Sequence, residues 1–283
     1  MALKDEYISN IIMYGNFQKS NSSPSPYEFK LLPQYETIFK AFDLKSIAAD
    51  GDTFDKSLRI MQWITDNSVY NGASPLPPTT SDKIIEFSYG KGEDGAINCA
   101  NKAILLADAL MSIGIFAMPV AGLNLIPDTK SENFMAGHSH VVTHVFLPEA
   151  NKWVVLDPSF NTHIVGKENI PLNVIEIIAA MRQGKELFTV SNENKEISTA
   201  GLACLTCCLL EICIWRGNDY THRNGMFGWD TAYYLVSEAY LLQVKKLLDE
   251  AQISEEIRAH LRQYVESEKI SIDELLAIPE LFQ

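Results

Sequence analysis

The feature that most constrains the fold is the uninterrupted run ANKAILLADALMSI at Ala100–Ile113. It is rich in alanine and leucine and contains neither glycine nor proline, which predicts a strong helix. Gly114 follows directly and predicts the end of that helix. A loop with three glycines, YGKGEDGAIN at residues 89–98, precedes it, and Ile115–Ala121 reads as a strand. We therefore expect a chain that mixes helices and strands around this helix.

A β-hairpin is predicted farther along the chain. The segment HVVTHVFL at His140–Leu147 alternates and is rich in β-branched residues, which is typical of a strand. Pro148–Lys152 predicts a turn, and Trp153–Leu156 predicts a short strand that returns alongside the first. Upstream, Phe54–Asn67 carries apolar residues at helical spacing and predicts an amphipathic helix.

The chain changes character after about residue 170. Helices are predicted there over five segments: Val174–Arg182, Ala200–Trp215, Asp230–Ala251, Ser254–Glu268 and Ser271–Ala277. We expect an N-terminal helical or irregular segment (residues 1–50), a core (51–168) and a helical C-terminal region packed on that core (169–283). The loop Arg216–Trp229 is a candidate substrate-contacting lid, because loops over rigid scaffolds often carry specificity.

Net charge excludes two classes of partner. The 283 residues carry a formal net charge of −13, and no basic patch is visible. This field repels phosphate backbones and anionic membranes, so we expect neither nucleic-acid nor membrane binding. The N-terminus has no secretory pattern, and the cysteines show no spaced framework, so a reducing cytoplasm is the default expectation.

Four of the five cysteines share one apolar stretch, GLACLTCCLLEICIW at Gly201–Trp215. Cysteine is a common core residue, so we interpret these four as packing thiols. A metal site built on C-x-x-C-C is the alternative, although such sites usually need a second ligand pair. The four are Cys204, Cys207, Cys208 and Cys213.

Cys99 differs from the other cysteines because it lies where the glycine-rich loop meets the predicted helix. Asn98 is a favoured N-cap residue, which places Cys99 at the first helical position. Free amides and the positive end of the helix dipole then surround its sulfur and favour the thiolate over the thiol. A small residue that merely packs at a helix start is the alternative.

Histidines on the predicted strand could supply the base that a nucleophilic cysteine needs. His138, His140 and His144 share one strand face. Asp157 follows the returning strand and falls opposite residue 142 or 143, where its carboxylate can accept the Nδ1 proton of His140 or of His144. The same three histidines with Asp157 could instead bind zinc or iron.

The run Gly95–Asn161 resembles the catalytic core of the transglutaminase-like superfamily. The matching pieces are GAINCANKAILLADALMSIGIFAMPVAG and HVVTHVFLPEANKWVVLDPSFN. The resemblance implies an α+β, papain-like fold in which a catalytic helix packs on an antiparallel sheet. It also implies that Cys99 is the nucleophile, that His140 rather than His144 is the catalytic histidine, and that Asp157 is the third member. Val142 and His144 depart from the family pattern, and both lie outside the triad.

The implied chemistry is thiol-dependent acyl transfer on a peptide, protein or small amide, with no cofactor. Hydrolysis is the default, and transfer to an amine is the alternative outcome on the same triad. A non-catalytic binding protein on the same fold is the alternative of another class. Candidates for oxyanion or substrate contacts are Asn98, Trp63, Asn101, His138, His144, His222 and Trp229, together with Trp215 directly before the candidate lid.

Overall fold

The computed structural model describes residues 25–74, 80–123, 139–193, 197–198, 209, 211–219, 232–249 and 255–278. The helices of this part of the chain are α2 (Pro33–Phe42), α3 (Leu44–Ala48), α4 (Thr53–Asn67), α5 (Ser81–Ser88), η1 (Gly92–Gly95), α6 (Cys99–Ser112), η2 (Pro148–Ala150), α7 (Val174–Arg182), α9 (Glu238–Leu248), α10 (Glu255–Glu266) and α11 (Ile272–Leu276). The strands are β1 (Ala117–Leu123), β2 (Ser139–Leu147), β3 (Lys152–Asp157), β4 (Thr162–Gly166), β5 (Leu187–Ser191), β6 (Ile197–Ser198), β7 (Glu211–Trp215) and β8 (Ala232–Leu235).

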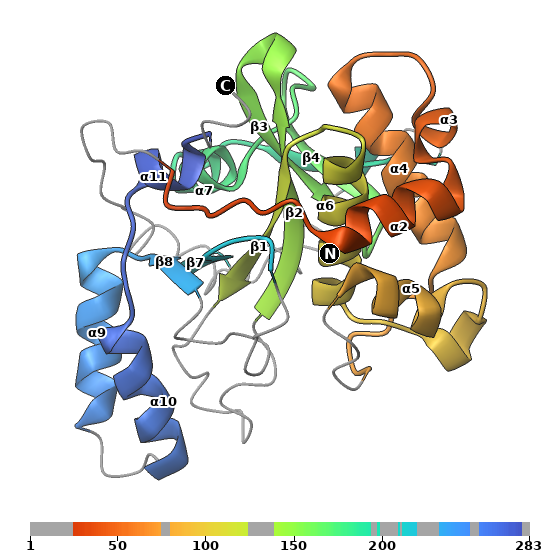
Figure 1. Ribbon diagram of the computed structural model, residues 1–283. Helices are drawn as coiled ribbons and strands as arrows, with labels where there is room; N and C mark the ends of the chain where they lie inside the picture. The colour runs from red at the N-terminus through yellow and green to blue at the C-terminus, as the bar shows by residue number, and fades with distance from the viewer. Residues whose placement is uncertain are drawn as a thin grey trace.

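The strands of the described residues form one antiparallel sheet in the order β6-β5-β4-β3-β2-β1-β7-β8. Helices α2, α3, α4 and α5 gather on one side, and α6 lies between them and β2 (Figure 1). Helix α6 packs against β1 and β2 as well as against α2, α4 and α5. The expected mixture of helices with an antiparallel sheet is confirmed, and α6 is its centre.

Helix α6 is buried on every side, from Cys99 to Met111. A helix that is hydrophobic all round belongs in a core, and this one fills the space between the sheet and the other helices. Its predicted end is confirmed: Gly114 has φ +86°, and its N–H donates to the carbonyl of Met111. The left-handed conformation explains the glycine, because other residues rarely adopt it.

The helical prediction for Ala200–Trp215 is wrong in its last part, because Glu211–Trp215 is strand β7. Strand β7 pairs with β1, with Ile214 opposite Val120. Ile212, Cys213 and Ile214 are all buried, so the strand lacks the alternation that a half-buried strand shows. A short, fully buried apolar run has the same sequence signature in a helix as in a strand.

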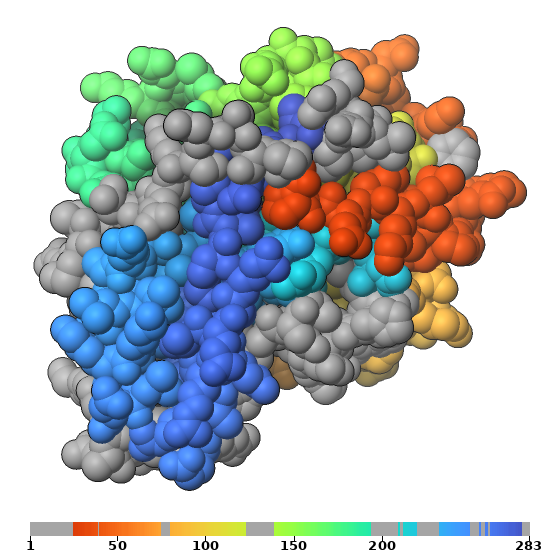
Figure 2. All heavy atoms as spheres, turned by 60° about the vertical axis from the view of Figure 1, so that its left-hand side comes forward, coloured from red at the N-terminus to blue at the C-terminus, as the bar shows by residue number. Residues whose placement is uncertain are grey.

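Further strands that the sequence does not predict join the sheet, most of them from the region expected to be helical. Ala232–Leu235 of the predicted helix Asp230–Ala251 forms β8, and β4, β5 and β6 were not anticipated as strands. Helices α7, α9, α10 and α11 are confirmed within their predicted segments, and α9 and α10 lie side by side (Figure 2). Residues 199–208 and 220–231 lie outside the described part of the chain. No helix that the structure describes has the length and apolar character of a membrane span.

Residues that precede the core are hydrogen-bonded to the segment that follows β7. Asn218 is fully buried, and its side chain accepts from the N–H of Lys30 at 2.7 Å and donates to the carbonyl of Lys30 at 2.6 Å. The N–H of Glu28 donates to the carbonyl of Arg216 at 2.7 Å. The space-filling view shows residues near position 30 beside the segment that follows β7 (Figure 2). The segment before the core and the segment after β7 therefore hold each other in place.

Asp108 is a buried carboxyl group near the C-terminal end of α6. The hydroxyl of Ser81 in α5 donates to its Oδ2 at 2.6 Å, and Tyr35 of α2 also interacts with it. Burial raises the pKa of Asp108 from its ordinary 3.8 to about 7, and Asp82 adds to that effect. The folded chain therefore holds this carboxyl protonated at a pH where a solvated aspartate has lost its proton.

His144 of β2 is a buried structural histidine. Its Nε2 accepts the backbone N–H of Val174 at 3.2 Å, at the start of α7, and its ring lies 5.7 Å from that of Trp153. Burial lowers the pKa of His144 from its ordinary 6.5 to about 3. The imidazole is therefore neutral and acts as a hydrogen-bond acceptor inside the fold.

We predict that Asp108→Asn makes the free energy of unfolding less sensitive to a rise in pH. The folded state keeps the proton of Asp108 up to about pH 7, whereas the unfolded state releases it near pH 4. The free energy of unfolding therefore falls as pH rises between those values. Relative to the variant, the wild type should lose about 2 kcal/mol of unfolding free energy between about pH 5.5 and pH 8. Urea denaturation of both proteins at the two pH values measures the difference, and parallel pH profiles would contradict it.

His144→Gln should give the opposite dependence on pH. The unfolded state binds a proton at His144 below about pH 6.5, and the folded state does so only near pH 3. The free energy of unfolding therefore falls as pH falls from about 6.5 toward 3. Relative to the variant, the wild type should lose about 2 kcal/mol between about pH 7 and pH 5. Equal losses in urea denaturation would show that the fold tolerates a charged His144.

Candidate active site

Cys99 is the first residue of α6, as the sequence predicts. Asn98 has extended backbone angles, and its side-chain oxygen accepts the N–H of Asn101 at 3.1 Å, which is the expected N-cap. Cys99 is only 6% exposed, so its thiol lies inside the protein surface. Amides of the first helical turn have no partner within the helix, and together with the helix dipole they favour negative charge at this position.

The loop before Cys99 is fixed by backbone contacts. The N–H of Ile97 donates to the carbonyl of Val69 at 2.9 Å, and the N–H of Asn71 donates to the carbonyl of Ile97 at 2.9 Å. Gly95 is needed for close packing, since a Cβ there would lie 2.8 Å from the carbonyl oxygen of Phe87. The segment around Tyr70 therefore holds the chain in place two residues before the thiol.

His140 and Asp157 form a buried pair on neighbouring strands. Nε2 of His140 lies 2.8 Å from Oδ2 of Asp157, and the two residues are 1% and 5% exposed. Thr143 of β2 pairs with Leu156 of β3, so Asp157 follows at the next position, opposite Val142, as the sequence predicts. The expected ring nitrogen is corrected: Asp157 contacts Nε2, not Nδ1.

Other contacts orient the Asp157 carboxylate and the His140 ring. Oδ1 of Asp157 accepts the N–H of Ser159 at 2.9 Å, where the chain turns after β3. The ring of Phe160 lies 5.7 Å from that of His140 and 5.4 Å from that of Tyr70. Tyr70 pairs with Ile97 in the loop before Cys99. A continuous set of contacts therefore connects the histidine pair to the segment that presents the thiol.

The other candidate residues lie in different surroundings. Asn98 and Asn101 form the start of α6 and are both 2% exposed. Trp63 packs in an aromatic cluster, with its ring 5.0 Å from that of Phe42 and 6.0 Å from that of Tyr89. Nε2 of His144 accepts the N–H of Val174 at the start of α7, so this ring nitrogen already has a partner other than Asp157.

Several predicted residues fall where the structure makes no statement. His138, His222 and Trp229 lie outside the described residues. Trp215, which directly precedes the candidate lid, is the last residue of β7 and is buried, so it belongs to the core. Cys213 is buried in the same strand, as expected for a packing thiol. Within the described ranges, no group of three or more histidine, cysteine, aspartate or glutamate side chains could hold a metal ion.

Two residues of the site were not anticipated from the sequence. Phe160 follows Asp157 by three positions, and an exposed aromatic residue after a strand has no distinctive pattern. Lys102 is 1% exposed and lies one turn after Cys99. A lone lysine near the start of an otherwise apolar helical run was a signal that could have identified it.

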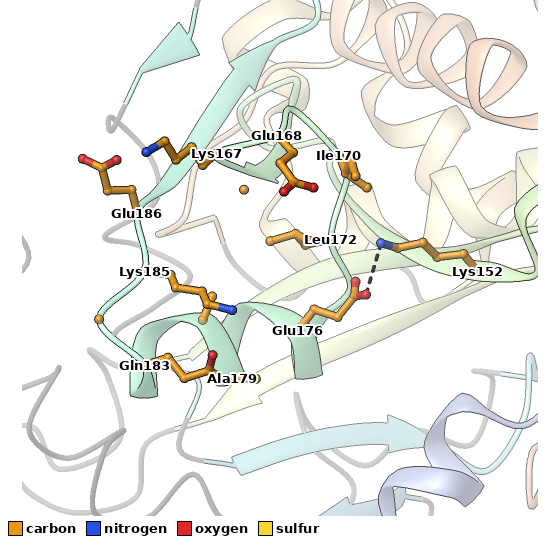
Figure 3. Close-up of a pocket in the computed structure, with 13 residues that line it drawn as sticks. Lys152, Lys167, Glu168, Ile170, Leu172, Glu176, Ala179, Gln183, Lys185 and Glu186 are labelled. Carbon is orange, nitrogen blue, oxygen red and sulfur yellow. Dashed lines mark ion pairs between the residues drawn. The ribbon is translucent and has the colours of Figure 1, made fainter.

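A hollow of about 740 Å³ lies elsewhere on the molecule, beside α7 (Figure 3). Leu172 and Lys185 help to line it, and Lys152 pairs with Glu176 at its edge at 3.1 Å. None of Cys99, His140 and Asp157 lines this hollow. It is therefore separate from the candidate active site.

Comparison with known proteins finds a family model that matches part of this chain. Residues 41–158 match the model of the transglutaminase-like superfamily. A crystal structure of a proposed cysteine protease from Cytophaga hutchinsonii is similar at 16% identity and a TM-score of 0.34, over 60% of this chain and 46% of that one. The chain thus spans less than half of that protein, and no curated protein sequence matches it. The matched residues, 41–158, contain Cys99, His140 and Asp157.

Proposed function

We propose that the chain is a thiol-dependent hydrolase that cleaves an amide or peptide bond through Cys99, His140 and Asp157. The observation that carries this proposal is the buried contact of 2.8 Å between His140 and Asp157, in a domain whose central helix begins at Cys99. A histidine held by a carboxylate can act as the base for a cysteine at a helix N-terminus, where the thiolate form is favoured.

The first half of the reaction forms a thioester. Sγ of Cys99 attacks the carbonyl carbon of the substrate, and His140 holds the proton of the thiol. The tetrahedral intermediate then breaks its C–N bond, and His140 gives the proton to the leaving amine. Because Asp157 contacts Nε2, the exchange with the thiol and the amine takes place at Nδ1.

The second half releases the acyl group. Water loses a proton to His140 and attacks the thioester carbonyl. The C–S bond breaks, the acid leaves, and the Cys99–His140 pair recovers its proton. The backbone N–H of Cys99, in the first turn of α6, is the proposed oxyanion donor, because no helical carbonyl accepts from it. The side-chain NH2 group of Asn98 is the candidate for a second donor. The side-chain oxygen of Asn98 accepts the N–H of Asn101 in the helix cap.

The proposed substrates are peptides, proteins or small amides, and water is the proposed acceptor. Transfer to an amine uses the same thioester and needs a site that excludes water. Adding a primary amine to the trapped acyl-enzyme and identifying the product by mass spectrometry separates the two outcomes: the free acid supports hydrolysis, and the amide supports transfer.

We predict that Cys99 reacts with iodoacetamide as a thiolate in mildly acidic solution. A free thiol at about pH 6 reacts at less than one hundredth of its rate at about pH 9. Cys99 should keep more than roughly one tenth of that rate, because its thiolate is stabilised by the amides and the dipole at the start of α6. The ratio does not depend on access to the thiol, and peptide mapping by mass spectrometry measures it for each cysteine.

Cys213 is the matched control, because it is also buried and described, and lies in β7 far along the chain from the site. Cys213→Ala should leave the alkylation profile of Cys99 unchanged, whereas Cys99→Ala should remove the fast reaction. A Cys99 profile equal to that of glutathione would overturn the proposed function.

Substitutions at Asp157 test its role with a reagent that acylates thiols, p-nitrophenyl acetate. Asp157→Asn keeps an oxygen that can accept from Nε2 of His140, whereas Asp157→Leu removes it. We expect the burst of p-nitrophenolate to slow by roughly 10²-fold or more in the leucine variant and by less in the asparagine variant. Equal rates in all three proteins would show that Asp157 does not orient the histidine.

A further inference from the structure

Helix α6 carries a buried lysine close to its nucleophile. Lys102 is three residues after Cys99, so the two side chains lie on the same face of the helix. Lys102 is 1% exposed, and lysine is almost never this deeply buried unless it is paired. Burial of its ammonium group has a high desolvation cost, which an apolar side chain at this position would avoid.

The contacts of Lys102 place its charge at the junction of α4 and α6. Its ammonium group donates to the backbone carbonyl of Ser68 at 2.8 Å. Ser68 ends α4, where the helix dipole is negative, and precedes Val69, which accepts from the loop before Cys99. The ammonium is therefore held by the same segment that positions the thiol.

Two carboxylates act on this ammonium. Burial lowers the pKa of Lys102 from its ordinary 10.5 to about 8, while Asp157 and, more weakly, Asp66 act to raise it. Asp157 is the carboxylate that contacts His140. Lys102 and His140 therefore both act on the same anion from different elements of the fold.

We infer that Lys102 is a positioning residue whose buried charge holds Asp157 and Cys99 in their anionic forms and opposes a second positive charge on His140. This inference rests on the proposed function. A cation near two anions and a histidine favours the anions and the neutral imidazole. Lys102 thereby extends, toward lower pH, the range in which the thiolate is available and His140 can act as a base.

The test follows the pH profile of Cys99 alkylation in Lys102→Met, which removes the charge and keeps a similar chain length. We expect the rising part of the profile to move upward by roughly half a pH unit or more. The wild-type and variant rates should converge above about pH 9, because Lys102 itself loses its proton above its pKa of about 8. Lys102→Arg should restore the wild-type profile if it folds.

Asp108→Asn is the matched control. It removes another buried ionisable side chain from the same helix, nine residues from Cys99, where Ser81 rather than the site contacts it. This variant should change stability without moving the alkylation profile. Thermal unfolding of each variant separates the two effects, since a purely structural Lys102 would change the melting temperature and leave the profile in place.

A second readout keeps this inference separate from the proposed function. In a Cys99→Ala background, NMR titration of His140 should move upward on Lys102→Met and stay unchanged on Asp108→Asn. No movement of His140 would overturn the role of Lys102, even if Cys99 is fast to alkylate. Movement of His140 with an unreactive Cys99 would support the charge coupling and overturn the proposed function.

Discussion

Burial of α6 on every side is the constraint on which the rest of the structure depends. Its first turn is buried, and the N–H groups there have no partner within the helix. Asn98 satisfies one of them, and the glycine-rich loop before it is tied to the segment around Tyr70. The sheet covers one face of the helix, and α2, α4 and α5 cover the others. Cys99 thus occupies a place where electropositive backbone groups meet a partly closed interior.

Three buried ionisable side chains show how differently the core treats charge. His144 is kept neutral by burial, and its ring accepts the N–H at the start of α7. Asp108 keeps its proton to near pH 7, because burial disfavours its carboxylate more than the hydrogen bonds from Ser81 and Tyr35 stabilise it. Lys102 is the one of the three that faces an opposite charge within the candidate site. Burial alone costs free energy, and the surroundings decide whether the group loses its charge or uses it.

The sequence was sufficient for the local features of the site. The asparagine before Cys99 predicted the helix start, and the hairpin length placed Asp157 opposite Val142. The choice of His140 came from the family resemblance and stays a prediction; in the structure His140 contacts Asp157, and His144 contacts the start of α7. The ring nitrogen was predicted wrongly, because it depends on the rotation of the side chain and not on strand register. Strand β7 was missed because a fully buried strand and a buried helix share an apolar pattern.

Strand β7 has a consequence for how this protein is assembled. It lies between β1 and β8 and covers the side of β1 that β2 leaves open. The family match ends at residue 158, long before β7 begins at Glu211. A sheet formed by the matched residues alone would expose the backbone of β1 as an unprotected edge, a template for pairing with other chains. The later segment therefore completes the sheet of the core, and that closure requires contacts distant in sequence, which form slowly during folding.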